Sequence, residues 1–367
     1  MQTTKIKDVI AYLESHAPRA YQESYDNSGL LTGDLEAPVT GTLLTIDCTE
    51  EVVEEAAVLG CNLIISHHPI LFKGLKSLTG RTYVERTIMA SVRKEIAIYA
   101  AHTNLDNVRH GVNKKIADQL GLVGTQILRP SRGSLSKLVT FVPPDSLDKV
   151  LEALHHAGAG SIGNYENCSF QVQGTGTFRP NQEASPVVGK AGNLEKAGET
   201  RVEVIFPTHV AESLLAALRG AHPYEEVAYY LSSLENENQD VGAGIIGELA
   251  SPQDALHFLE HVKKVMQAPV IRHTALPGKP IHKVAVCGGA GSFLLPDAIR
   301  RGAQVYISAD FKYHEFFDAD GKILIADIGH YESEQYTKEL FWEVLNQKFT
   351  TFAFHFSKTA TNPIRYL

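Results

Sequence analysis

Two stretches of the chain share one order of apolar and polar positions. The first has a continuous apolar run at residues 43–46, a helical pattern over 50–59, and a second apolar run at 63–66. A later copy of this order occupies residues 285–287, 295–301 and 305–308. Continuous apolar strands that alternate with helices are typical of a parallel sheet covered on both faces. The pattern therefore predicts two related α/β lobes.

A different repeat fills the middle of the chain. A β-type apolar run over residues 138–143, followed by a helical pattern over 146–157, reappears at 202–207 and 210–221. Two βαβ units in tandem predict a ferredoxin-like α+β sandwich. The polar, glycine-rich stretch at 179–200 lies between the two copies and predicts a long hairpin or a mobile loop.

Together the repeats predict a pseudo-twofold, two-lobed α/β domain that is interrupted by an inserted ferredoxin-like α+β domain. We expect the first lobe at residues 1–128, the insert at 129–244 and the second lobe at 245–367. An insertion of this kind requires that the ends of the inserted domain lie close together.

Composition and charge narrow the possible partners. The chain has 367 residues, 44% hydrophobic and 21% charged, and a net charge of -8 with scattered Lys and Arg, which disfavours nucleic acid and anionic membranes as partners. Four widely spaced cysteines without a CxxC pair favour neither a disulfide framework nor a thiolate zinc site. Residues 4–13 have the pattern of an amphipathic helix rather than a signal peptide. We therefore expect a cytoplasmic protein without a membrane segment.

Polar side chains follow three of the predicted strands. His67 and His68 follow the strand at 62–65, His102 and Asp106 follow the strand at 96–100, and His330 and Glu334 follow the strand at 322–325. Because ligands of open α/β sheets bind beyond the carboxyl ends of the strands, we expect these side chains at one rim. His330 and Glu334 are four residues apart and share one face if a helix begins there. Imidazole and carboxylate ligands suit Zn, Fe(II) or Mn, so the sequence predicts a divalent metal site.

Each of these features also has an ordinary structural explanation. A single His pair, or one His and Glu four apart, is more often a surface or hydrogen-bonded group, but several at equivalent strand ends favour a metal site. His102 either assists a ligand, contacts substrate or is structural, and Asp327 either orients a ligand or caps a turn. The glycines within residues 288–292 are suited either to binding phosphate through backbone N–H groups or to forming a tight turn. Their spacing matches neither the Walker nor the GxGxxG motif, which favours the turn. Residues 310–315 are either a solvated helix start or a substrate-facing acid, base or phosphate contact.

Five motifs occur in order across both lobes. They are YDNSGLL at 25–31, SHHP at 66–69, HTNLDN at 102–107, SADFKYHEFFDA at 308–319 and GHYESE at 329–334. As a set they resemble the signatures of the GTP cyclohydrolase I type 2 family, also called the NGG-interacting-factor-three-like family. One departure is Ser308-Ala309-Asp310, where that family often has Thr-Gly-Glu or Thr-Gly-Asp.

The resemblance implies a dinuclear metal site and an assembly. It implies two divalent ions per chain, with zinc as the first expectation and iron or manganese as alternatives, and Asp106 and Glu334 contact or bridge them. The implied ligands are His67, His68, Asp106, His330 and Glu334. The segment at 222–227, HPYEEV, resembles a motif of the PII/CutA-like insert of long bacterial members. Members are known as toroidal homohexamers in which trimers stack and the inserts cover the openings.

Two classes of function fit this resemblance. We favour two-metal hydrolysis, in which a metal-activated water attacks a nucleotide-like substrate and His102 or His314 acts as acid or base. The family name implies opening of the purine ring of GTP. The rival is a non-enzymatic assembly that senses metal or a nucleotide-like ligand through the insert. DNA threaded through the ring is disfavoured by the acidic charge balance.

Overall fold

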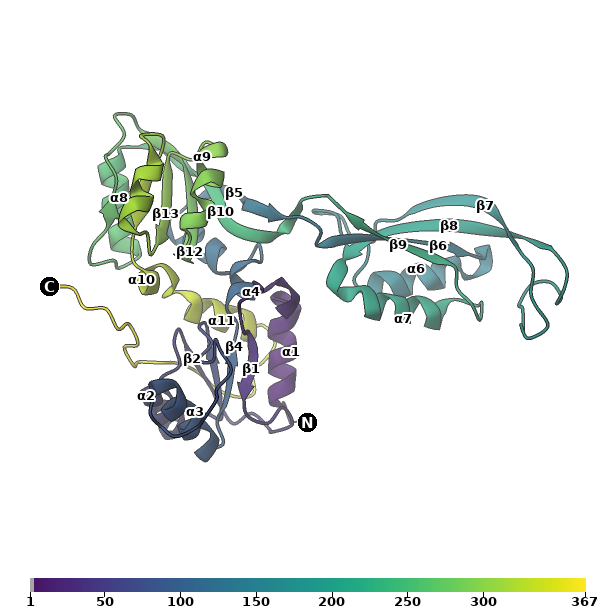
Figure 1. The fold of residues 1–367 in the computed structure, drawn as a ribbon, viewed down its shortest axis with the longest axis horizontal. Coiled ribbons are helices and arrows are strands. Elements are labelled where there is room, and N and C mark those ends of the chain that lie inside the picture. The colour runs from purple at the N-terminus through teal and green to yellow at the C-terminus, as the bar shows by residue number, and fades with distance from the viewer. Residues whose placement is uncertain (1–2) are drawn as a thin grey trace. The chain divides into compact units, whose positions relative to one another are not determined.

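The chain has a mixed α/β fold with three β-sheets in two compact units (Figure 1). The computed structural model describes residues 3–367. The first unit comprises the chain up to Arg129 together with Val241–Leu367, and the second unit comprises Pro130–Asp240. For comparison, the sequence repeats predict the insert at residues 129–244.

The first sheet of the first unit has five strands in the order β1-β4-β3-β2-β15. Their bounds are β1 Gly29–Thr32, β2 Thr42–Thr45, β3 Leu63–Ser66, β4 Ala97–Ala100 and β15 Phe354–Phe356. All neighbours are parallel except β1, which pairs antiparallel with β4. Because β2, β3 and β4 are each completely buried, they read as continuous apolar runs in the sequence.

The second sheet has six strands in the order β11-β14-β13-β12-β10-β5. Their bounds are β5 Val123–Ser131, β10 Asn238–Gln253, β11 Arg272–His273, β12 Ile281–Ala290, β13 Val305–Ala309 and β14 Leu324–Asp327. Here too three central strands, β12, β13 and β14, are parallel, and an antiparallel edge strand pairs with the last of them. The two sheets thus share the arrangement that the first sequence repeat predicts.

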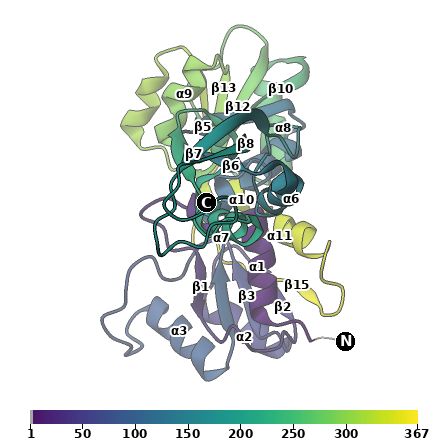
Figure 2. The same cartoon turned by 90° about the vertical axis from the view of Figure 1, so that its right-hand side faces the viewer.

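Helices cover both faces of the two sheets. The helices of this unit are α1 Ile6–His16, α2 Glu50–Val58, α3 Tyr83–Arg93, α4 Thr103–Asp106, α5 Val112–Gln119, α8 Ala255–Val265, α9 Leu295–Arg300, α10 His330–Glu334 and α11 Thr337–Leu345, with 3₁₀ turns η1 Arg19–Tyr21, η4 Ser292–Leu294 and η5 Tyr313–Ala319. One core combines a face of each sheet with α1, α5, α8 and α11, and two smaller cores lie on the opposite faces. Figures 1 and 2 both show α10 between the two sheets.

The second unit is a four-stranded antiparallel sheet with two helices. Its elements are β6 Leu135–Val142, η2 Pro144–Ser146, α6 Leu147–His156, β7 Phe170–Phe178, β8 Glu195–Pro207, η3 Thr208–Val210, α7 Ala211–Ala221 and β9 Tyr229–Leu234. The strand order is β7-β8-β6-β9. The buried side chains of β6 and β8 pack with those of both helices in one core, so α6 and α7 cover the same face.

Two details differ from the sequence predictions. The stretch at 179–200, predicted as a long hairpin or a mobile loop, contains the connection and part of one strand of the β7–β8 hairpin, because residues 195–200 belong to β8 and pair with β7. Their polar composition hid the strand, since this part of the hairpin is largely exposed. The helix expected from Tyr331 onward is two helices, α10 and α11, which are separated at Gln335 and Tyr336.

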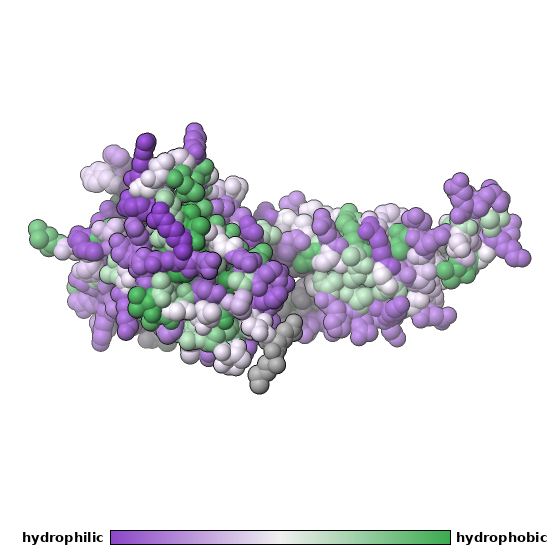
Figure 3. Space-filling model, turned by 90° about the horizontal axis from the view of Figure 1, so that it is seen from below, coloured by the Kyte–Doolittle hydropathy of each residue, from purple (hydrophilic) through white to green (hydrophobic). Residues whose placement is uncertain are grey.

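The surface is mainly polar. On the face in Figure 3, hydrophobic residues form small groups among hydrophilic ones. Within residues 3–367, the helices are all too short or too polar to cross a membrane.

Candidate metal centre

The first two imidazoles of the site follow strand β3 directly. The backbone N–H groups of His67 and His68 donate to the carbonyl oxygen of Ile46, just beyond the neighbouring strand β2. The Ser66 hydroxyl donates to the carbonyl oxygen of His68 and so closes the turn. The His67 side chain is fully buried, and the His68 side chain is nearly so. The parallel pairing of β2 and β3 thus fixes both rings at the end of the sheet.

Each sheet also delivers one His and one acid that are a helical turn apart. After β4, His102 precedes the short helix α4 and Asp106 ends it. After β14, His330 begins α10 and Glu334 ends it. Residues four apart on a helix lie on the same face, so each short helix presents its imidazole and its carboxylate together.

The carboxylate of Glu334 lies among three imidazoles. Its Oε2 is 3.0 Å from Nε2 of His68 and 3.2 Å from Nε2 of His330. Its Oε1 is 3.7 Å from Nε2 of His67, and Oδ1 of Asp106 is 3.6 Å from that same nitrogen. The structure therefore brings together all five predicted ligands, which approach from the ends of both sheets.

A fixed tautomer of His67 shows that these residues fit a cation. Its Nδ1 is 2.9 Å from the carbonyl oxygen of Ala101, which can only accept, so Nδ1 carries the proton. In the neutral ring the lone pair of Nε2 then faces the carboxylates of Asp106 and Glu334. The buried atoms Nε2 of His67, Oδ1 of Asp106 and Oε2 of Glu334 have no hydrogen-bond partner. Because unpartnered buried polar atoms are costly, a positive ion among these atoms is the simplest way to satisfy them.

Geometry alone yields two groups of possible ligands that share His68. One is His67 with His68 and His102, and the other is His68 with His330 and Glu334. The first group contains His102 and omits Asp106, although the Asp106 carboxylate is 3.6 Å from Nε2 of His67. Oδ1 of Asp106 is buried without a hydrogen-bond partner, so Asp106 is also available to a cation in this cluster. The donor set is nitrogen and oxygen only, as Zn, Fe(II) and Mn accept.

Every imidazole of the cluster is held at Nδ1 by an oxygen. Besides Ala101 for His67, these oxygens belong to Asp47 for His68 at 2.7 Å, Asp310 for His330 at 2.7 Å and Asp26 for His102 at 2.8 Å. In all four rings Nε2 is therefore the nitrogen left for the centre of the cluster. Carboxylate or carbonyl partners of this kind are usual for metal-binding histidines, where they fix the ring and its tautomer.

The titratable groups of the cluster depend strongly on one another. Burial lowers the pKa of His68, but the hydrogen bond to Asp47 and the negative charge of Glu334 outweigh it and raise that pKa to about 10. Burial, with the nearby charge of Glu334, raises the pKa of Asp106 to about 7. Burial also opposes ionisation of Glu334, yet the imidazoles of His67 and His330 hold its pKa well below the usual range. The negative charge of Glu334 is therefore retained only beside positive charge.

A cavity of about 770 Å³ opens onto this cluster. His68, His102, Asp106, His330 and Glu334 line its inner part. Tyr25, Phe72, Tyr83 and Phe293 also line it, and each of these four aromatic side chains is at least half exposed. The site is thus reachable by a small molecule from solvent.

The segment after β15 is tied to the same cluster. The Thr361 hydroxyl donates to Oδ2 of Asp47 at 2.7 Å, and Asp47 in turn holds His68. The Asn362 amide donates to Glu332 at 3.0 Å, and Thr361 and Pro363 line the cavity. This segment therefore supports the site through hydrogen bonds.

The sequence and the fold both match one family. The family model described as Duf34/NIF3 (NGG1p interacting factor 3) matches residues 4–363. The chain belongs to the Duf34/NIF3 family. The family prediction made from the five motifs is thereby confirmed.

Curated Duf34/NIF3 relatives carry the name GTP cyclohydrolase 1 type 2 homolog. One from Halalkalibacterium halodurans is 41% identical over 333 residues, which cover 90% of this chain and 89% of that protein. One from Bacillus subtilis is 36% identical and covers 98% of both chains. Among solved structures, a Bacillus cereus protein related to NIF3 aligns over all of both chains with a TM-score of 0.87 and 36% identity. A Staphylococcus aureus protein aligns equally fully with a TM-score of 0.79 and 28% identity.

Other predicted positions of this Duf34/NIF3 chain lie elsewhere. His314 is exposed in η5, where its ring contacts Tyr313 and Phe317, and it does not line the cavity. Asp327 caps the turn after β14, since its carboxylate accepts from the backbone N–H groups of Phe311 and Gly329.

Gly288 and Gly289 belong to the end of strand β12, where its pairing with β13 is irregular, and they do not form the tight turn that the sequence favours. The N–H of Gly288 donates to Asn113, and that of Gly289 donates to the Ser333 hydroxyl. Both N–H groups are therefore used within the chain and do not point freely at a phosphate. Gly289 has φ +60° and lies against Glu334 and His330.

Sequence reasoning missed the carboxylates that hold the imidazoles. Asp47 was not singled out, Asp26 appeared only within a motif, and Asp310 was considered only as a substrate contact. Asp47 and Asp310 follow β2 and β13 just as the ligands follow other strands, so the same strand-end rule could have found them. Thr361 carries no signal of this kind.

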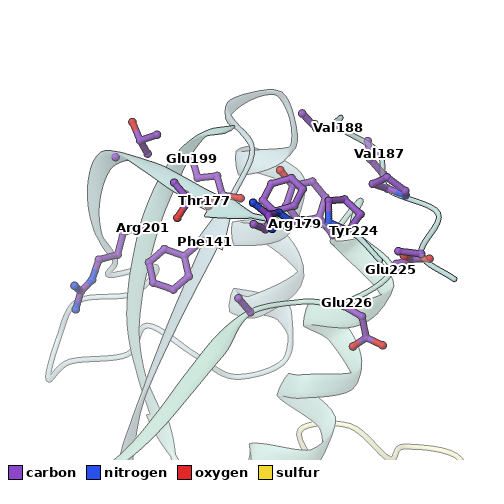
Figure 4. A pocket seen from close by; sticks show the side chains of 18 of the residues that line it. Phe141, Thr177, Arg179, Val187, Val188, Glu199, Arg201, Tyr224, Glu225 and Glu226 are labelled. Carbon is purple, nitrogen blue, oxygen red and sulfur yellow. The ribbon is translucent and has the colours of Figure 1, made fainter. Parts of the chain in front are cut away.

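The second unit contains a separate cavity of about 690 Å³ (Figure 4). Its lining comes from β7, β8, the following loops and the segment near Tyr224, and Figure 4 shows Arg179, Glu199 and Tyr224 among these side chains. Across residues 3–367, both groups of possible metal ligands lie in the first unit.

Proposed function

We propose that this Duf34/NIF3 protein is a metal-dependent hydrolase that binds two divalent ions, zinc in the first place, on His67, His68, Asp106, His330 and Glu334. The observation that carries the proposal is the buried Nε2 of His67, which faces two carboxylates without a hydrogen-bond partner. Two divalent ions bound there would lower the pKa of a water molecule and would polarise a substrate oxygen.

The chain itself supplies acid and base help through His102. Asp26 accepts from Nδ1 of His102 at 2.8 Å and also from the Thr103 backbone N–H at 3.0 Å. Burial opposes ionisation of Asp26, but its hydrogen bonds to His102 and Thr103 hold its pKa well below the usual range. An ionised Asp26 orients His102, whose Nε2 is then placed to take a proton from water and to pass it to a leaving nitrogen. His314 is not proposed for this role, because it does not line the cavity.

Hydrolysis of a C–N bond is the reaction class that this arrangement suits. The oxygen of water bonds to carbon, the C–N bond breaks, and the proton given up by water reaches the nitrogen. The curated relatives named GTP cyclohydrolase 1 type 2 homolog point to a ring C–N bond as the bond to be tested first.

Metal analysis and an activity screen test this proposal together. We expect close to two ions per chain, and turnover of a ring compound that is lost in His67→Ala. In His102→Gln we expect full metal content and reduced turnover, since the residue acts as a base rather than a ligand. Loss of metal from His102→Gln would make His102 a ligand. A metal-loaded protein that turns over no substrate in a broad screen would favour a sensing assembly instead.

We also propose the finer architecture that the resemblance implies. The second unit has the strand order and helix placement of a ferredoxin-like insert, as in PII/CutA-like domains. One row across its sheet contains Phe170, Glu203, Val139 and Tyr230, and the exposed fractions of the aromatic residues Phe170 and Tyr230 are 65% and 62%. Such a face is suited to self-association, which supports a toroidal homohexamer. Native mass spectrometry of the full chain tests this, and a monomer would contradict it.

A further inference from the structure

We infer that the cavity at the metal centre takes an uncharged planar ring compound, a nucleobase or nucleoside, and discriminates against nucleoside triphosphates. The inference rests on the proposed function, because it names the substrate class of that same site. Charge and the aromatic lining carry it independently of each other.

The first argument is the absence of cations. Among the described residues that line the cavity there is no Lys and no Arg, whereas Glu23, Asp47, Asp106 and Glu334 contribute carboxylates. Besides divalent metal ions, proteins that bind triphosphates supply Lys, Arg or free backbone N–H groups to the phosphates. Here the N–H groups of Gly288 and Gly289 are already used.

Two bound metal ions do not give the site a net positive charge. Two divalent ions bring four positive charges, and five carboxylates contact the cluster of imidazoles: Asp26, Asp47, Asp106, Asp310 and Glu334. The loaded site is therefore close to neutral or slightly negative. A polyanion gains little from such a site, whereas an uncharged ligand is not repelled.

A guanidinium near the cavity is also engaged elsewhere. Arg129 lies over the ring of Phe293 at 4.8 Å from its centroid, and its Nη1 is 3.7 Å from the Asp297 carboxylate. Arg129 is not among the residues that line the cavity, and its guanidinium already contacts Phe293 and Asp297.

The second argument is the set of aromatic rings. Tyr25, Phe72, Tyr83 and Phe293 are between 50% and 68% exposed although they line a cavity. Exposed aromatic faces stack on planar bases and tolerate any base. The ring of Phe72 meets that of His102 edge-on at 5.6 Å, so a base stacked on Phe72 lies next to the proposed proton carrier.

Isothermal titration of the full-length, metal-loaded protein with matched ligands tests the inference. The ligands are the four common ribonucleosides with their monophosphates and triphosphates, and metal content is measured after each titration because triphosphates chelate metal. We expect at least one nucleoside to bind, and its affinity to fall with added phosphates by about tenfold or more for the triphosphate. Tighter binding of a triphosphate, or binding of no nucleoside, would overturn the inference.

Two variants separate the arguments. Phe72→Ala should weaken nucleoside binding at least about fivefold with unchanged metal content, whereas Phe317→Ala, an exposed aromatic in η5 outside the cavity lining, should not. Glu23→Gln should raise triphosphate affinity relative to nucleoside affinity. Equal effects of Phe72→Ala and Phe317→Ala would remove the stacking argument. Nucleoside binding without turnover would leave this inference standing and count against the hydrolase proposal.

Discussion

Glu334 is the side chain on which the candidate site depends most, because its two oxygens lie among His67, His68 and His330. Replacement by Gln keeps its size but removes the charge that offsets two dications. We expect Glu334→Gln to lose at least one ion while the fold survives, as measured by metal content beside the melting temperature. An ordinary acid in a first helical turn would contribute only about 0.3–1 kcal/mol and leave metal content unchanged.

The neighbouring Glu332 is not a suitable control for that variant. It is 4% exposed and accepts from the Asn362 amide, so its replacement disturbs the fold by itself. Glu260 on the solvent side of α8 is exposed and forms no part of the site. Glu260→Gln should keep full metal content, and full metal content in Glu334→Gln as well would refute the ligand assignment.

Asp47 acts on the metal through His68. In Asp47→Asn the amide can still contact Nδ1 of His68, but the charge that fixes the ring is lost. Loss of such a partner typically costs about 10–100-fold in metal affinity. Competition with a chromogenic chelator measures this change. An affinity within about twofold of the unchanged protein would show that Asp47 does not support the ligand.

The strand-end rule explains which site residues could be predicted. His67, His68, Asp106, His330 and Glu334 all follow an apolar strand within a few residues, and strand ends of a parallel sheet converge. Which oxygens hold the imidazole rings at Nδ1 depends on which strands become neighbours in the sheet. A single sequence does not reveal that order. His314 also follows a strand, but η5 directs its side chain to solvent.

The end of strand β12 is the segment that most closely confines the candidate ligands. A Cβ on Gly289 would lie 2.5 Å from Oε1 of Glu334 and 3.2 Å from Nε2 of His330. Gly289 also has φ +60°, a conformation that costs other residues about 1–2 kcal/mol. We expect Gly289→Ala to lose both stability and metal affinity, measured by thermal unfolding with and without chelator.

Gly302 offers a matched comparison for Gly289. It has φ +75°, and a Cβ there would meet no atom within 4 Å. Gly302→Ala should therefore show the backbone cost alone and bind metal normally. If both variants bind metal equally well, the close approach of β12 to Glu334 has no functional role.

The elements were predicted well where packing is periodic and poorly where it is not. Buried strands such as β2 and β3 are continuous apolar runs, so their order was readable. The break between α10 and α11 could not be predicted from the sequence, because both helices contain buried residues and no proline or glycine lies between them. Residues 195–200 were missed for the opposite reason, since they form a strand in a largely exposed hairpin.

For the whole molecule, the division into units predicts that the first can do without the second. β5 and β10, which lead to and from the second unit, are neighbours in one sheet, so a short turn can join them. We expect a chain with residues 130–240 replaced by a short Gly-Ser linker to stay folded and to bind the same metal. Circular dichroism and metal content check this, and insoluble or metal-free protein would contradict it.

The ligands on the two sides of the second unit are made at different times. His68 and His330, whose Nε2 atoms are 3.2 Å apart in the folded protein, are 262 residues apart in sequence. At translation rates of about 5–20 residues per second, the second half of the cluster follows the first by on the order of 10–50 s. During that interval the nascent chain offers His67, His68 and Asp106 without the carboxylate that joins the two halves. Under the two-ion proposal, correct loading would therefore wait until the second lobe has emerged and docked, and an ion captured earlier would be held by half of its proposed ligands.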